Sequence, residues 1–113
     1  MLKIYHNPRC KKSREGLEIL EQSGKDFEVV KYLEDVPSSD EIKTLIRYLG
    51  VAPLDLVRKN EAIWKDNYKG KKLSDAEIID IMAQHPKLIE RPIVVKGKKA
   101  VIGRPPITIK KLL

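Results

Sequence analysis

The hydrophobic and polar positions of this chain follow two different spacings, which predict strands alternating with helices. Residues 1–5 alternate apolar and polar side chains, as a half-buried strand does. Small and apolar residues then recur at helical spacing up to residue 20, and Gly24 is a typical helix stop. Residues 26–32 form the next strand pattern. Because a helix connects these two strands, we expect them to be parallel.

The middle of the chain has a helical pattern with two clear helix starts. Ser38 with Glu41, and Ser74 with Glu77, have the spacing of a capping box, in which each side chain bonds to the backbone of the other residue. Residues 52–66 contain two shorter helical segments between these helices. The pattern therefore predicts a helical insert over residues of about 34–90.

The C-terminal part returns to a strand pattern. Residues 91–102 predict a β-hairpin that turns at Gly97, and a last helix begins at residues 104–106. The predicted order is βαβ, the helical insert, and ββα. At 113 residues, we expect one α/β domain over residues 1–113.

Composition and charge narrow the function classes. The net charge is +7, but the lysines fall in separate loops and ends, and aromatic residues make up only 5% of the chain. This distribution argues against nucleic-acid binding and favours the attraction of anionic substrates. We find no apolar run of membrane-spanning length and no signal-peptide core, so we expect a cytoplasmic protein without membrane contact. A single cysteine excludes an internal disulfide and argues against a metal site, as does the wide separation of the two histidines.

That cysteine, Cys10, lies between the first predicted strand and the first predicted helix. Helix N-termini stabilise a thiolate and also bind oxyanions. Basic side chains flank the position on both sides, at residues 9, 11, 12 and 14. A helix terminus stabilises a thiolate by only about 0.3–1 kcal/mol, which is too little to keep the thiol ionised at neutral pH. We therefore expect the Cys10 sulfur to accept hydrogen bonds from the Ser13 hydroxyl, the N–H groups of residues 11–13, or a protonated His6. The alternative is that Cys10 is a small buried hydrophobic residue, but its position favours a reactive thiol.

Four segments, at residues 6–14, 56–60, 85–95 and 103–105, together with the element order, resemble the arsenate reductase family that depends on glutaredoxin and glutathione. The resemblance covers the whole chain. It implies a thioredoxin-like fold with a four-stranded mixed sheet and the inserted helical lobe. It also implies a cis peptide bond before Pro92, beside the reactive cysteine.

The same resemblance implies the roles of individual residues. Cys10 is the expected nucleophile, assisted by His6 and Ser13. The expected ligands of the arsenic oxyanion are three arginines, Arg58, Arg91 and Arg104. Arginine suits this task because its planar guanidinium matches the oxygens of a tetrahedral anion and keeps its charge.

The resemblance also implies a reaction, in which arsenate is reduced to arsenite through a covalent adduct on Cys10. No cofactor is bound. The resemblance implies glutathione as the co-substrate and glutaredoxin as the protein partner, and the absence of a second cysteine means that the electrons come from outside the chain. We expect a monomer.

Two other functions stay open at this stage. One is an Spx-type regulator that binds RNA polymerase, although Ser13 stands where the oxidation sensors of that group have a second cysteine. The other is a glutathione-dependent thiol oxidoreductase that does not act on arsenate.

Overall fold

The chain forms two compact units in the computed structural model, which describes residues 2–113; Met1, expected in the first strand, lies outside the described residues. The two ends of the chain, up to Asp35 and from Arg91 onward, make the first unit. The second unit, Val36–Glu90, is the segment expected as a helical insert over residues of about 34–90.

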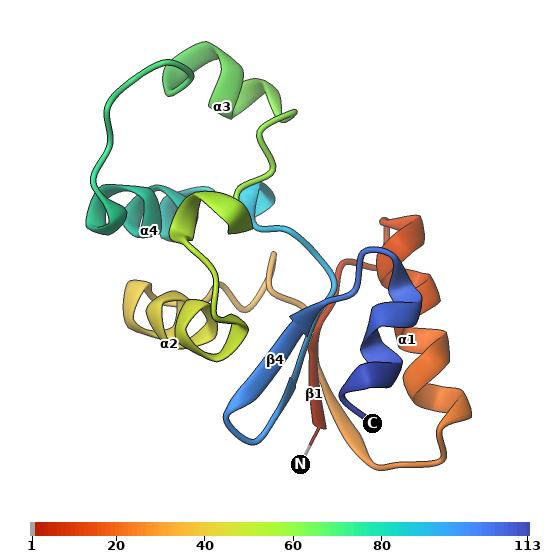
Figure 1. Ribbon diagram of the computed structural model, residues 1–113. Coiled ribbons are helices and arrows are strands. Elements are labelled where there is room, and N and C mark those ends of the chain that lie inside the picture. Colours follow the sequence, from red (N-terminus) through yellow and green to blue (C-terminus); the bar gives the residue numbers. More distant parts are fainter. Residues whose placement is uncertain (1) are drawn as a thin grey trace. The chain divides into compact units, whose positions relative to one another are not determined.

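The first unit is built on a four-stranded mixed sheet, as the sequence predicted. The sheet order is β2-β1-β3-β4, in which β1 and β2 are parallel while β3 is antiparallel to both β1 and β4. Helix α1 (Lys11–Gln22) and the C-terminal helix η3 (Pro106–Lys111) pack side by side on one face of this sheet (Figure 1). The strands are β1 (Leu2–Tyr5), β2 (Phe27–Val30), β3 (Ile93–Lys96) and β4 (Lys99–Ile102).

The core of this unit follows from the alternation seen in the sequence. Leu2 and Ile4, two residues apart on β1, face the same side of the sheet. They are buried together with Leu20 of α1, Val94 of β3 and Ile109 of η3. Each fully buried aliphatic side chain of this kind contributes about 1.5–3 kcal/mol to folding. This core fixes α1, and with it Cys10, against the sheet.

Two glycines allow an unusually close approach below the start of α1. A Cβ at Gly16 would lie 2.8 Å from Pro92 Cγ and 2.9 Å from Ile109 Cδ1. A Cβ at Gly103 would meet the same two side chains, each at 2.9 Å. The peptide bond before Pro92 is cis, as predicted, and so is the bond before Pro105. The helix that begins after Cys10 is therefore in direct contact with the turn that contains Pro92.

The last helix is a 3-10 helix and not the α-helix that the sequence predicted. Its turns close with bonds to the third preceding residue, as from the Thr108 N–H to the Pro105 carbonyl, 3.0 Å. Pro105 and Pro106 have no N–H groups to donate, and the β-branched residues that follow have a reduced preference for the α-helix.

The second unit consists of helices and short turns. The Ser38 hydroxyl accepts the Glu41 N–H at 3.1 Å, and Ser74 and Glu77 form both halves of their capping box. Helices α2 and α4 pack together, and η1 and η2 each pack on α4. None of the helices in residues 2–113 has the length and apolarity needed to cross a membrane. The helices are α2 (Ser39–Leu49), η1 (Pro53–Leu56), α3 (Ala62–Asn67), α4 (Asp75–Gln84) and η2 (Pro86–Leu88).

Candidate functional site

Cys10 is the N-cap residue of α1, with an extended backbone (φ −95°, ψ 122°). Its N–H donates to the Asn7 carbonyl at 3.0 Å, and its carbonyl accepts the Arg14 N–H at 3.0 Å. The residue is half-buried and its thiol is free. The first N–H groups of the helix have no partners within the helix itself, so they are available to a thiolate or an anion.

The surroundings of the thiol favour its charged form. Burial raises the pKa of the Cys10 thiol, but this effect is outweighed by the Ser13 N–H, by a hydrogen bond from the Arg91 guanidinium together with its charge, and by the Lys12 N–H. The net pKa lies below the ordinary value. The backbone N–H groups were predicted from the sequence. The cation that lowers the pKa is Arg91, whereas the sequence pattern had pointed to the basic residues next to Cys10.

His6 and Ser13 lie together beneath the loop that carries Cys10. The His6 Nδ1 atom is 2.6 Å from the Ser13 hydroxyl, and both side chains are buried. Burial lowers the pKa of His6, and the positive charges of Lys31 and Arg14 act in the same direction, against a backbone hydrogen bond with Ser13. Burial therefore disfavours the charged imidazolium, and assistance of the thiolate by His6 stays a prediction.

Asn7 is a residue that the sequence analysis missed. Its N–H donates to the Ser13 hydroxyl at 2.9 Å, its carbonyl accepts the Cys10 N–H, and its side-chain oxygen accepts the Arg9 N–H at 3.0 Å. These three bonds fix the turn between β1 and α1. Asparagine next to proline is a known turn signal, because its side chain bonds to the backbone two residues later, and this signal could have identified it.

Arg91 lies beside Cys10 in the first unit, and Arg104 contacts Arg91. Arg91 is only 9% exposed, and its Nε atom is buried with no hydrogen-bond partner among residues 2–113. Arg104 Nη1 donates to the Arg91 carbonyl at 3.2 Å. The structure thus brings Arg91 to Cys10, while a role of Arg104 at the thiol stays a prediction. An unpaired buried N–H is costly, and a bound anion would provide its acceptor.

Arg58 belongs to the second unit, where two carboxylates hold it. Its Nη1 atom lies 2.6 Å from Glu61 Oε1, and its Nε atom lies 3.3 Å from Glu90 Oε1. Its N–H donates to the Leu88 carbonyl at 2.7 Å, beside an isolated β-bridge that pairs Val57 with Ile89. Its guanidinium is paired within its own unit, and its place in an oxyanion site stays a prediction.

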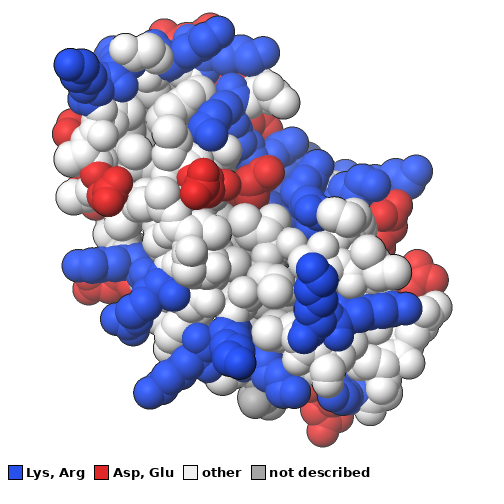
Figure 2. All heavy atoms as spheres, viewed as in Figure 1, with Lys and Arg blue, Asp and Glu red and all other residues white. Residues whose placement is uncertain are grey.

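A metal centre finds no support in the part of the chain that the structure describes. Residues 2–113 contain no cluster of three or more histidine, cysteine or acidic side chains able to hold a metal ion. On the face shown in Figure 2, lysine and arginine side chains are mixed with acidic and neutral ones.

Comparison with known proteins agrees with this geometry. Residues 5–112 match the ArsC family. The chain belongs to that family. It is 40% identical to an arsenate reductase of Haemophilus influenzae, in a match that covers 97% of each chain. It is 46% identical to an uncharacterised Escherichia coli protein, YfgD, over 93% of this chain and 90% of the relative.

The solved structures of this family share the fold. An arsenate reductase from Vibrio cholerae superposes with a TM-score of 0.94 at 46% identity, covering 99% of this chain and 97% of that one. The similarity extends over the thioredoxin-like sheet and the helical insert alike. The predicted fold is therefore confirmed over the whole matched length.

Proposed function

We propose that this protein is an arsenate reductase that uses Cys10 as its nucleophile, glutathione as its co-substrate and glutaredoxin as its protein partner. Several relatives at 40–46% identity carry the name arsenate reductase. The observation that carries the proposal is the pairing of a thiol of lowered pKa with Arg91, whose buried Nε atom has no acceptor. Such a site has both a nucleophile and an unfilled place for an oxyanion.

The first step uses the charge around the sulfur. The Cys10 thiolate attacks the arsenic of arsenate, and one oxygen leaves as water after protonation, which gives a sulfur–arsenic adduct. Arg91 binds the oxygens of the anion and neutralises their charge, and Arg104 supplies a second cation. Guanidinium groups suit this role because they bind two oxygens at once and cannot be deprotonated.

The second step transfers two electrons. A glutathione thiolate attacks the sulfur of the adduct, so that a disulfide forms and the sulfur–arsenic bond breaks with its electron pair on arsenic. Arsenic falls from the +5 to the +3 state and leaves as arsenite. A further thiol, from glutaredoxin, then reduces the mixed disulfide and regenerates Cys10. Electrons must come from outside because the chain has one cysteine.

His6 and Ser13 assist by holding the loop around the thiolate. The Ser13 N–H stabilises the charged sulfur, and its hydroxyl is fixed between His6 and Asn7.

The test is the release of arsenite from arsenate by the purified protein. We expect turnover with glutathione and glutaredoxin, slower turnover with thioredoxin as donor, and none from Cys10→Ser. Disulfide exchange with glutathione but no arsenite from the native protein would instead indicate a thiol oxidoreductase that does not act on arsenate.

A further inference from the structure

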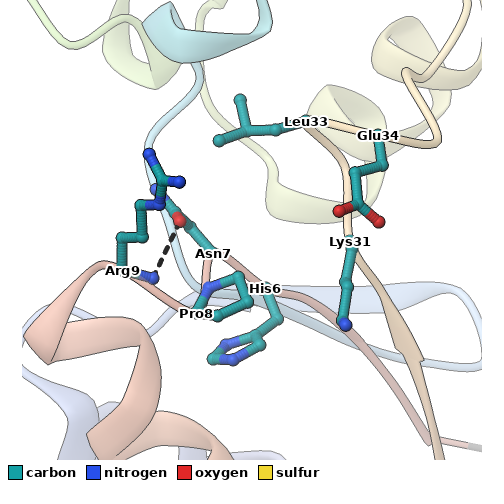
Figure 3. A pocket seen from close by; sticks show the side chains of 7 residues that line it. All are labelled: His6, Asn7, Pro8, Arg9, Lys31, Leu33 and Glu34. Carbon is teal, nitrogen blue, oxygen red and sulfur yellow. Dashed lines mark hydrogen bonds between the residues drawn. The ribbon is translucent and has the colours of Figure 1, made fainter.

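A cavity opens beside the loop that carries Cys10, entirely within the first unit. Its volume is about 280 Å³. Figure 3 shows the β1–α1 loop residues on one side of it and the segment after β2 on the other. The cavity is lined by His6, Asn7, Pro8, Arg9, Lys31, Leu33 and Glu34. Four of these residues, 6–9, directly precede the nucleophile in the chain, although Cys10 itself does not line the cavity.

The charges around this cavity are of both signs. Arg9 and Lys31 bring two cations and Glu34 one carboxylate, all three on exposed residues. Within residues 2–113, none of these three side chains forms an ion pair. Opposite charges that line one cavity without neutralising each other suit a ligand that itself carries both signs.

This pattern does not suit the oxyanion. A dianion would be repelled by Glu34, and a single tetrahedral ion would leave most of the cavity empty. The buried nitrogen without an acceptor belongs to Arg91, which does not line this cavity. The buried Arg91 nitrogen and the cavity are therefore two separate features that can bind an anion. Only the Arg91 nitrogen offers the positive charge that arsenate needs without the opposing carboxylate of Glu34.

We propose that this cavity is the binding site of the thiol reductant, a small peptide thiol with carboxylates and a free ammonium group. Lys31 and Arg9 bind its carboxylates, and Glu34 binds its ammonium group. The inference rests on the proposed function, since it names where the co-substrate of that reaction sits. Its volume is near the lower end of the range for ligand sites, so we place only part of the peptide in the cavity, with its thiol outside and directed toward Cys10.

The step served by this site can be measured without arsenate. The Cys10 thiolate attacks glutathione disulfide, a new disulfide forms between Cys10 and one glutathione, and the other glutathione leaves as a thiolate with the electron pair of the broken bond. No outside oxidant is needed, because the disulfide itself is the oxidant. Hydroxyethyl disulfide undergoes the same exchange but has neither carboxylates nor ammonium groups.

The experiment compares the rates of these two exchanges and takes their ratio, which cancels changes in the reactivity of the thiol. Lys31→Ala should lower the ratio of the glutathione rate to the hydroxyethyl rate by about fivefold, the upper range for one exposed ion pair. Lys31→Arg should keep the ratio. The matched control is Lys43→Ala, which removes one positive charge from α2.

Glu34→Gln separates recognition from general electrostatic attraction. Glutathione disulfide is an anion, so if the protein attracted it only by net charge, the loss of Glu34 would raise the ratio. If Glu34 binds the ammonium group, the ratio falls. A ratio unchanged in Lys31→Ala, lowered equally in Lys43→Ala, or raised in Glu34→Gln would overturn the proposal. Because arsenate is absent from the assay, these outcomes are independent of whether the protein reduces it.

Discussion

Replacing Gly16 by alanine tests whether the close approach of α1 to Pro92 is essential to the fold. The added methyl group would lie 2.8 Å from Pro92 Cγ and 2.9 Å from Ile109 Cδ1, and both of these residues are fully buried. The proline ring cannot rotate away, so either α1 or the turn at Pro92 must move. Such a movement also displaces the start of α1, and with it Cys10, relative to Arg91.

The expected magnitude is the difference between two opposing effects. Overpacking a buried contact costs about 1–3 kcal/mol. Alanine gains about 0.8–1.0 kcal/mol over glycine inside a helix. We therefore expect Gly16→Ala to lower the free energy of unfolding by about 1 kcal/mol, with a range of about 0–2 kcal/mol.

A double-mutant cycle with Ile109→Val separates the two effects. Valine lacks the Cδ1 atom, so one of the two short contacts disappears. Alone, Ile109→Val should cost about 0.5–1.5 kcal/mol. In that background the cost of Gly16→Ala should fall by at least about 0.5 kcal/mol, which is a measurable coupling energy for residues in contact. Urea unfolding of the four proteins supplies the free energies.

Two results would refute this reasoning. The first is a stabilisation of about 1 kcal/mol by Gly16→Ala, which is what helix propensity alone predicts. The second is an equal effect of Gly16→Ala in both backgrounds, because the methyl group would then not meet Ile109.

Four further experiments test the site. Arg91→Met should raise the pKa of Cys10, seen as a higher midpoint in the pH titration of thiolate absorbance. Arg91→Ala and Arg104→Ala should each lower arsenate reduction roughly a hundredfold, the scale of losing one positioned charge, with only partial rescue by lysine. Ser13→Ala should cost about 1–3 kcal/mol of unfolding free energy, because it leaves a buried backbone N–H without its acceptor. The pKa of His6 is lowered in the folded protein, so below a pH of about 6.5 the unfolded chain binds a proton at His6 more readily than the folded chain does. The free energy of unfolding should therefore decline as the pH falls below about 6.5. His6→Asn should reduce this decline.

Each of these expectations has a contrary result. An unchanged thiolate midpoint in Arg91→Met would mean that the guanidinium does not act on the sulfur. Alanine variants of Arg91 and Arg104 that reduce arsenate like the native protein would remove both from the oxyanion site. Native stability of Ser13→Ala would mean that water replaces the hydroxyl. An identical acid decline in His6→Asn would assign the decline to carboxyl groups.

The fold could be predicted because its signals are local. Each signal depends on residues close together in the sequence: the alternation in residues 1–5, the helix between this strand and the next, and the hairpin turn at Gly97. Together they predicted the parallel pair and the antiparallel hairpin that the sheet contains. The helix start at Ser74 could also be predicted from the sequence, because the two side chains that form its capping box are only three residues apart.

The site was less predictable because its contacts join distant residues and depend on burial. No pattern around Cys10 shows that Arg91 supplies its positive charge; only the family resemblance pointed there. The charge state of His6 depends on how deeply its ring is buried, which spacing does not reveal. The pairing of Arg58 with Glu90 joins residues far apart in sequence, so local reading left Arg58 as a free cation.

The buried Ser13 hydroxyl has a practical consequence for identifying what reacts with this protein. It occupies the position where a two-cysteine oxidoreductase has its second sulfur, and it is held by His6 and Asn7. In such enzymes, that second sulfur must be removed by mutation before a reaction partner can be caught. If Cys10 reacts as proposed, the native chain should itself act as the trap, because a partner joined to Cys10 could leave only when another molecule arrives. Native protein purified rapidly under limiting reductant should therefore come out with its physiological sulfur partner still attached.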